Sequence, residues 1–318
     1  MEGGVQMEKI RKEIKDFKKN KALLLMVLPG TIWLVIFSYI PMIGTIIAFK
    51  DFRISGNGFF DSILTSEWVG LENFKFLFST SDAWVITRNT VAYNLTGLIL
   101  GLVMSVLVAI IMSELTQKYL VKIYQTGMLF PYFLSWVVIS YFVYAFLSSD
   151  KGMVNGILQA FGQDPISWYS EPKFWPVIII FLGIWKSLGY NSIIYYASIM
   201  GIDRSYYEAA MIDGASKFKQ ITKVTIPLLM PLVSIMLILS IGSIIRSDFG
   251  LFYQVTRNSG ALNDVTNVLD TYIYRGLTNN GDLGMTTAAG LYQSVVGFVL
   301  VILTNLLARR IDKDSALF

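Results

Sequence analysis

Six apolar stretches, each of about 20 residues or more, limit what this chain can fold into more than any other feature. They cover approximately residues 22–49, 87–113, 119–147, 174–200, 224–245 and 286–308. An α-helix rises 1.5 Å per residue, so about 20 residues cross roughly 30 Å of hydrocarbon. The sequence therefore predicts an all-α membrane protein with six transmembrane helices.

Composition agrees with this prediction and argues against an enzyme. Hydrophobic residues make up 54% of the 318 positions and charged residues 15%, and the mean hydropathy of +0.56 is high for a soluble domain. The chain contains neither cysteine nor histidine. It therefore lacks disulfides, thiolate metal ligands and the usual general base of hydrolases and zinc proteases. We expect no catalytic residue and no metal site.

Three segments are expected along the chain. Residues 1–21 hold seven Lys and Arg residues, with Ile10, Ile14 and Phe17 on one helical stripe. This pattern predicts a basic amphipathic segment on the inner membrane surface, or alternatively a docking segment for a partner. Residues 22–308 form the transmembrane domain and 309–318 a tail. The first apolar stretch far exceeds the roughly 7 to 15 apolar residues of a signal peptide, so we expect it to be retained.

Lysine and arginine counts orient the six helices. Residues 1–21, 114–122, 201–223 and 309–318 carry 16 Lys and Arg residues in 63 positions, whereas 50–88, 148–173 and 246–286 carry 9 in 106. Cationic loops stay in the cytoplasm. We therefore expect both termini and the loop 201–223 to be cytoplasmic, in a multi-pass protein of a bacterial inner membrane.

The loop 201–223, between the fourth and fifth stretches, has the sequence pattern of a capped helix. Ser205 followed by Glu208 fits a capping box, in which each side chain binds a free main-chain N–H group. Gly214 suits the left-handed residue that ends a helix. Ala209 and Ala210 leave a small surface that another protein can approach closely. Singly, each residue fits an ordinary surface helix equally well.

Prolines mark the neighbouring spans. Pro131 predicts a kink in the third span. Pro227 and Pro231 fall in the first turns of the fifth, where a missing N–H costs little. Ahead of them, Phe218 and Ile221 can anchor a second short helix against the membrane.

Together, the residues of this loop are similar to a known motif. Glu208-Ala-Ala, a glycine after three further residues, and an Ile-Pro pair about a dozen residues on resemble the EAA loop of permeases from binding-protein-dependent ABC importers. The resemblance implies the type I importer permease fold, with the loop 203–227 forming a coupling helix that seats in a cleft of a separate ATPase. The coupling residues that it implies are Glu208, which meets the ATPase, Ala209 and Ala210, which allow close packing, Asp213, and Gly214, which forms the turn.

Weaker motifs along the chain look like the polysaccharide and complex-oligosaccharide branch of the carbohydrate importers, which includes relatives of the maltose-type permeases. These motifs are Leu28-Pro-Gly, Tyr39-Ile-Pro-Met, Ile47-Ala-Phe-Lys-Asp, Gly70-Leu-Glu-Asn-Phe and Leu269-Asp-Thr-Tyr-Ile-Tyr-Arg-Gly. They imply import of an oligosaccharide or polysaccharide fragment. A peptide, an amino acid or an inorganic anion is the alternative solute.

The chain has no nucleotide-binding motif of its own. The pattern G-x-x-x-x-G-K-[ST] does not occur, so ATP and Mg must bind to another subunit. The resemblance implies two ATP-binding subunits, a second and usually paralogous permease, and an extracytoplasmic solute-binding protein. We expect no cofactor in this chain and no nucleic-acid partner.

Polar side chains in the fourth span predict a solute pathway. Lys186 lies near the centre of the span, where insertion costs roughly 2.5–3.5 kcal/mol and a lysine is kept if it faces protein or water. Aromatic rings stack on sugar faces, while amides and hydroxyls bind sugar hydroxyls. The alternative is helix packing, with the lysine bound to a carbonyl or to a carboxylate of a partner permease. The candidates are Trp185, Lys186, Ser187, Tyr190 and Asn191.

The fifth span adds three serines. Ser240, Ser243 and Ser247 follow i, i+3, i+7 and are predicted to share one helix face. In the maltose-type relatives, solute-contacting positions lie in the two spans that flank the coupling loop, which favours a pathway role. Close helix packing is the alternative. Arg246 and Asp248 are interpreted as a pair at the membrane interface.

Two other functional classes fit less well. An intramembrane enzyme needs a catalytic pair, but Asp248 is the one acid near the core spans and there is no histidine. An ion-coupled carrier is favoured by inverted repeats with broken helices at matching positions, and the sequence shows neither.

Overall fold

The computed structural model describes residues 20–75 and 81–311, which form two compact units. Unit 1 comprises residues 1–73 and unit 2 residues 74–318, and each is described by itself. Most of the expected amphipathic segment 1–21 and of the tail 309–318 lies outside the described residues.

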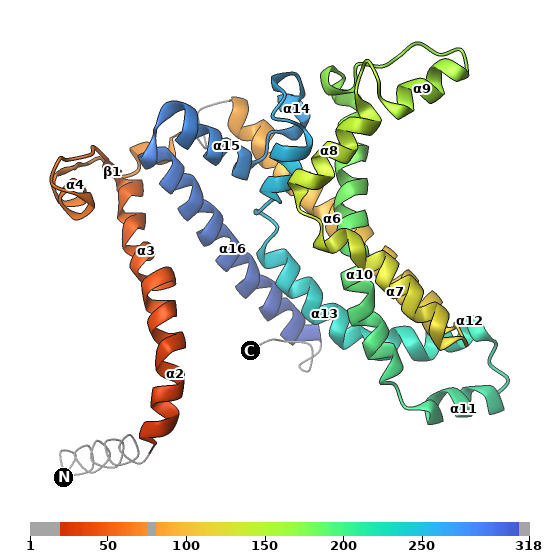
Figure 1. The fold of residues 1–318 in the computed structure, drawn as a ribbon. Coiled ribbons are helices and arrows are strands. Elements are labelled where there is room, and N and C mark those ends of the chain that lie inside the picture. The colour runs from red at the N-terminus through yellow and green to blue at the C-terminus, as the bar shows by residue number, and fades with distance from the viewer. Residues whose placement is uncertain (1–19, 76–80, 312–318) are drawn as a thin grey trace, which may run out of the picture. The chain divides into compact units, whose positions relative to one another are not determined.

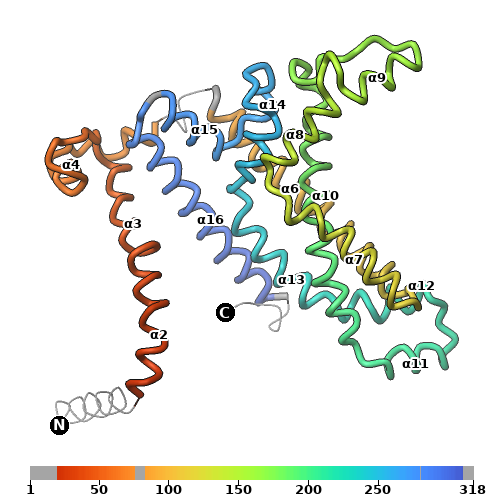
Figure 2. The backbone as a smooth tube through the Cα atoms, viewed as in Figure 1, coloured from red at the N-terminus to blue at the C-terminus, as the bar shows by residue number. Residues whose placement is uncertain are grey.

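Unit 1 is a long apolar helix followed by a small polar module (Figures 1 and 2). Its elements are α2 (Lys21–Leu34), a π-helical turn (Val35–Tyr39), α3 (Ile40–Ile43), a 3-10 helix (Gly44–Phe49), β1 (Lys50–Asp51), α4 (Phe59–Thr65), β2 (Glu67–Trp68) and a 3-10 turn (Glu72–Phe74). The first four elements make one apolar span, Lys21–Phe49. None of the side chains in its most apolar 18-residue window is buried, as expected for a helix that faces lipid or another subunit.

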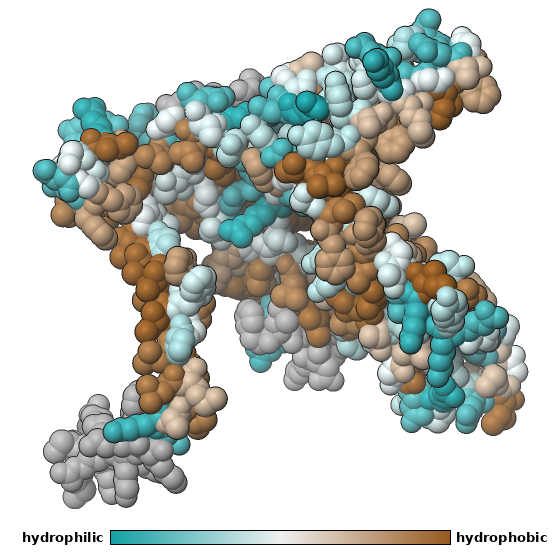
Figure 3. All heavy atoms as spheres, in the orientation of Figure 1, coloured by the Kyte–Doolittle hydropathy of each residue, from teal (hydrophilic) through white to brown (hydrophobic). Residues whose placement is uncertain are grey.

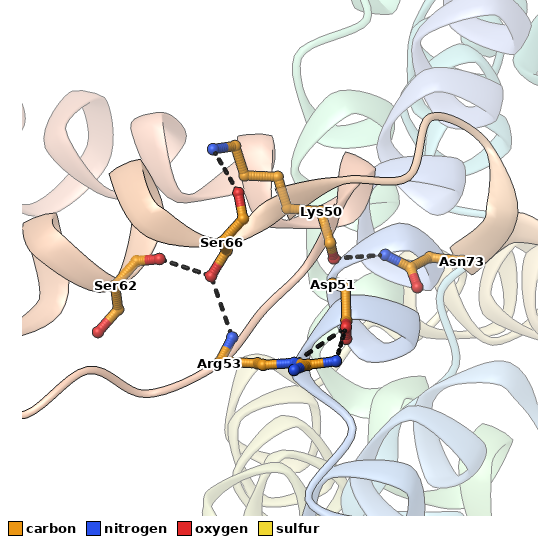
Figure 4. Close-up of polar contacts among 6 residues, drawn as sticks. All are labelled: Lys50, Asp51, Arg53, Ser62, Ser66 and Asn73. Carbon is orange, nitrogen blue, oxygen red and sulfur yellow. Dashed lines mark hydrogen bonds and ion pairs between the residues drawn. The ribbon is translucent and has the colours of Figure 1, made fainter.

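The module after this span joins two of the sequence motifs. β1 and β2 pair antiparallel, with Lys50 opposite Trp68. The Asn73 amide donates to the main-chain oxygens of Ala48 (3.1 Å) and Lys50 (2.9 Å), so the motif beginning at Gly70 is tied to the motif beginning at Ile47 (Figure 4). These bonds satisfy backbone groups that such a short sheet leaves free.

Unit 2 holds the remaining helices. Its elements are α6 (Ser81–Ser113), α7 (Lys118–Phe133), α8 (Trp136–Leu147), α9 (Met153–Ala160), two 3-10 turns (Trp168–Ser170 and Pro172–Phe174), α10 (Trp175–Met200), α11 (Arg204–Ile212), α12 (Lys217–Gln220), a π-helical turn (Ile221–Thr225), α13 (Ile226–Gly242), a π-helical segment (Gly250–Val255), a 3-10 turn (Gly260–Leu262), α14 (Asn263–Thr266), α15 (Leu269–Arg275), a π-helical turn (Gly276–Asn280) and α16 (Leu283–Ile311). In Figure 1, α11 and α12 lie at the end of this unit opposite α9 and α14.

The prediction of an all-α fold with six apolar spans is confirmed. Within the described residues, five continuous helical spans are long and apolar enough to cross a membrane, and α7 with α8 makes a sixth. Figure 3 shows the middle of unit 2's helices as mostly hydrophobic and the ends as more hydrophilic. The fifth span differs from the predicted limits 224–245. It begins at Lys217 and ends at Gly242.

The third span is broken rather than kinked at its proline. α7 and α8 meet at an angle of 98°. Pro131 lies inside α7, and the break falls at Leu134 and Ser135, with the Ser135 hydroxyl accepting from the Val138 N–H as the N-cap of α8. The predicted kink at Pro131 is therefore wrong by one helical turn. Because a helix ends there, its last carbonyls are left without helical partners.

Helix α10 is the centre of unit 2, packing against α6 and α7. Its start tolerates Pro176 because first-turn N–H groups have no helical partner. A Cβ on Gly189 would lie 2.0 Å from the Met128 carbonyl oxygen, so α10 and α7 touch backbone to backbone there. One buried apolar cluster, around Trp175, lies at the α9 end, and another, around Tyr195, lies towards α11.

Candidate functional site

The N-terminus of α11 is capped by Asp203. Its carboxylate accepts from the Ser205 N–H at 2.9 Å. The predicted capping box of Ser205 and Glu208 is thus wrong, because the helix begins two residues earlier than that box requires. The hydrogen bond from the Ser205 main chain lowers the pKa of Asp203 below its ordinary value.

The C-terminus of α11 ends as predicted, with Gly214 in the left-handed region at φ +74°. The Gly214 N–H donates to the Met211 oxygen (3.0 Å) and the Ala215 N–H to the Ala210 oxygen (2.9 Å). These two bonds form a Schellman motif, whose left-handed position favours glycine because it has no Cβ.

The surface of α11 is unusually open for a helix with apolar residues. None of its side chains is buried. Glu208, Ala209 and Asp213 are exposed, and Ala210 is half-buried. Ile212 is 87% exposed, and Tyr206 and Met211 are exposed as well. An exposed apolar patch of this kind is typical of a binding surface for another protein.

α11 is connected directly to the base of the fifth span. The Tyr207 hydroxyl and Thr225 Oγ1 lie 2.9 Å apart, and Thr225 is buried in the π-helical turn before α13. Lys217, at the start of α12, forms an ion pair of 2.9 Å with Glu114, just beyond the end of α6. A displacement of α11 would therefore be transmitted to the fifth span, which is itself paired with the end of α6.

The predicted second short helix is part of the fifth span. α12 runs through the π-helical turn into α13 without a break. Phe218 is 73% exposed, whereas Ile221 packs against the buried cluster around Tyr195. Their role as anchors against the membrane stays a prediction. The π-helical turn directly precedes Pro227, which removes one N–H from the regular α-helical pattern.

A cavity of about 410 Å³ opens between the helices of unit 2. It is bordered by α6, α7, α8, α10, α13 and the segment after α13. Five of the predicted pathway residues line it: Lys186, Ser187, Asn191, Ser240 and Ser243. It differs from a closed apolar void, since 11 of its 26 lining residues are partly buried or exposed polar and aromatic groups of the kind that hold a ligand.

Three predicted pathway residues do not line this cavity: Trp185, Tyr190 and Ser247. Tyr190 acts indirectly, because its ring stacks on the cavity residue Tyr132 at 4.7 Å. Ser247 lies beyond the end of α13 at Gly242, so the predicted common face of Ser240, Ser243 and Ser247 is wrong. Its main-chain N–H donates to Asp270 instead.

Lys186 is held by the broken third span. Its ammonium group donates to the oxygens of Leu134 (2.6 Å), Tyr132 (2.8 Å) and Pro131 (3.4 Å). These are carbonyls at the end of α7, where regular helical partners run out; the Pro131 oxygen also accepts from the Leu134 N–H at 3.2 Å. The structure therefore supports the alternative in which Lys186 binds carbonyls, although the same side chain also borders the cavity.

Arg246 and Asp248 both border the cavity, although the sequence suggested an interfacial pair. Asp248 accepts from the Trp136 indole N–H at 2.6 Å and from the Gly250 N–H at 3.0 Å. No ion pair joins Arg246 to Asp248 among the described residues.

Sequence reasoning missed the contribution of α6. Gly97 and Gly101 line the cavity, and a Cβ at either would meet nothing within 4 Å. Their spacing of four residues places them on one helix face, which was the available signal. Ser105 continues this face, and its buried hydroxyl has no hydrogen-bond partner among the described residues. The amide of Asn191 likewise has none there.

Comparisons with known proteins agree on one family. Residues 97–313 match the family described as Binding-protein-dependent transport system inner membrane component. The chain is 31% identical, over 97% of its length and 94% of the relative, to the Polygalacturonan/rhamnogalacturonan transport system permease protein YteP of Bacillus subtilis (strain 168).

Two solved structures are similar over nearly the whole chain. One is of a bacterial ABC transporter involved in the import of the acidic polysaccharide alginate, with a TM-score of 0.85, 32% identity, and coverage of 95% of this chain and 99% of that one. The other is of a bacterial alginate ABC transporter in complex with an alginate pentasaccharide-bound periplasmic protein, with a TM-score of 0.84, 32% identity, and coverage of 94% and 98%. With the family match and the shared fold, the chain belongs to the inner membrane permease components of binding-protein-dependent transport systems.

Proposed function

We propose that this chain is the permease subunit of an ATP-driven importer of oligosaccharides or polysaccharide fragments. The relatives named above are permeases for such solutes, which favours a sugar over a peptide, an amino acid or an inorganic anion. The chain itself supplies half of the translocation pathway and no chemistry. ATP and Mg bind to a separate subunit.

The single observation that carries this proposal is the exposed α11 surface with its direct contact to the fifth span. An apolar helix surface that no described residue covers fits a motor subunit, and the Tyr207–Thr225 contact provides a route for force. In this proposal Glu208 and Asp213 supply polar contacts to the ATPase, and Ala209 and Ala210 let it approach closely. Gly214 fixes where the helix ends.

The assembly that we propose has two permeases, two ATP-binding subunits and one extracytoplasmic binding protein. The second permease is a paralogue of this chain. The lysine and arginine distribution supports placing α11 and both termini in the cytoplasm, and α9 and α14 outside, in a bacterial inner membrane.

In the proposed mechanism, ATP closes the motor subunits and draws the two coupling helices together. The fifth span follows through the Tyr207–Thr225 contact, and α6 follows the fifth span through the Lys217–Glu114 ion pair. The cavity then opens outward to receive the solute, as in other alternating-access transitions. Within it, Ser187, Asn191, Ser240 and Ser243 are the proposed solute contacts, and Lys186, whose donors bind the end of α7, supplies positive charge. Trp185, Tyr190 and Ser247 are not proposed as direct contacts.

A pair of matched substitutions tests the proposal. Ala209→Trp adds bulk to the exposed face of α11, and Ala160→Trp adds the same bulk to exposed α9 at the opposite end of unit 2. We expect both proteins to insert normally. Only Ala209→Trp should lose the co-purified ATPase and ATP-dependent oligosaccharide uptake. Normal ATPase binding and uptake by Ala209→Trp would contradict the proposal.

A further inference from the structure

Three charged side chains border the cavity, and two of them are already engaged. The ammonium group of Lys186 has three N–H donors, and it makes three hydrogen bonds to main-chain oxygens at the end of α7. It has no donor left for a ligand while these bonds persist. Lys186 therefore contributes positive potential rather than a binding group.

Asp248 is engaged as well. One carboxylate oxygen accepts from the Trp136 indole and the other from the Gly250 N–H. Its charge is opposite to that of Lys186, so the two together leave little net charge in the cavity.

Arg246 is different from both. It follows the end of α13, borders the cavity and is exposed. Among the described residues, nothing accepts a hydrogen bond from its guanidinium group, and it forms no ion pair. Asp270 is the other carboxylate in its field, but one oxygen of Asp270 already accepts from the Ser247 N–H (2.7 Å) and the Gln293 amide (3.2 Å). The Arg246 donors thus stay free, while the Asp270 carboxylate lies within the electrostatic field of the guanidinium group.

An arginine with free donors at a polar cavity suits a carboxylate in particular. The planar guanidinium group presents paired N–H donors that match the two oxygens of a carboxylate, and it stays charged at every physiological pH. The unpartnered Asn191 amide in the same cavity suits a sugar hydroxyl. A ligand with carboxylates and hydroxyls along one chain would use both groups.

From this arrangement we propose that Arg246 is the carboxylate-binding residue of the cavity and that the solute is an acidic oligosaccharide built from uronic acids. The inference rests on the proposed importer function and narrows its solute class. A neutral oligosaccharide would leave the Arg246 donors unused and would gain nothing from the charge.

The test uses the complete reconstituted transporter with its own binding protein and a panel of uronic acid di- to tetrasaccharides. Each is compared with its methyl ester, which keeps the length and hydroxyls but removes the charge. Arg246→Gln removes one cation from the cavity. Lys173→Gln removes one from the outer surface, where Lys173 pairs with Glu171, and serves as the matched control.

The readout is the ratio of acidic to esterified uptake in each variant, divided by the wild-type ratio. Binding-protein preferences cancel because the same binding protein is used throughout. We expect Arg246→Gln to lower this ratio about tenfold, Arg246→Lys to lower it less, and Lys173→Gln to leave it within twofold.

Two results would overturn the inference while leaving the importer function intact. In the first, wild-type transporter takes up neutral oligosaccharides and no uronic acid oligosaccharide. In the second, Arg246→Gln lowers acidic and esterified uptake equally or changes neither. Failure of the wild-type transporter to import any oligosaccharide would overturn the proposed function and the inference together.

Discussion

Replacing Gly214 by alanine tests the role of the coupling helix with a control built into the same chain. Gly162, which follows α9, has the same φ of +74°. It also belongs to a Schellman motif. The Gly162 N–H donates to the Gln159 oxygen and the Gln163 N–H to the Leu158 oxygen, both at 2.9 Å. A Cβ at Gly162 or at Gly214 would meet nothing within 4 Å. Both substitutions therefore strain only the backbone.

The expected cost is the same at both glycines. A left-handed conformation costs an L-residue about 1–2 kcal/mol, which changes an equilibrium by about 5- to 30-fold. At Gly214 the strain destabilises the C-terminal end of α11, so we expect uptake to drop at least about fivefold. At Gly162 it falls on an outer helix, and uptake should stay within twofold. Gly214→Asn should lie between wild type and alanine because asparagine tolerates this conformation.

The assay is ATP-dependent uptake by the reconstituted complex, normalised to the amount of inserted permease. ATP hydrolysis is measured in parallel, since weakened coupling lowers transport per ATP hydrolysed. Equal loss of uptake in Gly214→Ala and Gly162→Ala would refute the reasoning, because the loss would then come from backbone strain at either helix end and not from the role of α11. Wild-type uptake by Gly214→Ala would refute it as well.

Three further predictions concern packing, the helix break and pH. Gly189→Ala places a methyl group against the Met128 carbonyl and should lower the Tm of the purified complex by about 3–10 °C. Gly101→Ala is the control, because a Cβ there has open space, and it should leave the Tm unchanged. Lys186→Met removes charged hydrogen bonds, each with a net contribution of about 1.5–3 kcal/mol, and should increase hydrogen exchange at the α7–α8 corner. Unchanged exchange would show that the break between α7 and α8 does not depend on Lys186. Because its pKa is lowered in the folded chain, Asp203 stabilises α11 above its unfolded pKa of about 3.9, and this contribution is lost as pH falls through the folded value. Amide exchange in α11, corrected for the intrinsic rate, should thus rise below about pH 4 in wild type and not in Asp203→Asn, and a pH-independent wild type would contradict this.

The fold could be predicted because its main determinants are local. Apolar length defines the spans, and the left-handed glycine at 214 is set by its own missing side chain. The EAA-like string predicts the short helix α11 for the same reason. The family resemblance rests on residues within that one loop and on a few short motifs between Leu28 and Gly276.

The cavity was harder to predict because its geometry depends on distant residues. The break at Leu134 is stabilised by Lys186, which lies 52 positions away in the sequence. Ser247 leaves the serine face because α13 stops at Gly242, and glycine is an ambiguous signal since it is also frequent within transmembrane helices. Asp203 replaced Ser205 as the cap because both residues are good caps and only the helix start decides between them.

Cysteine labelling tests most directly on which side of the membrane α11 lies and whether the ATPase covers it there. The chain has no cysteine, so Ala209→Cys and Ala160→Cys each introduce one thiol. With a membrane-impermeant maleimide, Ala209→Cys should react only in inside-out vesicles and become protected when the ATPase is bound, while Ala160→Cys should react only in right-side-out vesicles. Labelling of Ala209→Cys in right-side-out vesicles, or no protection by the ATPase, would contradict the account of α11 as the coupling helix.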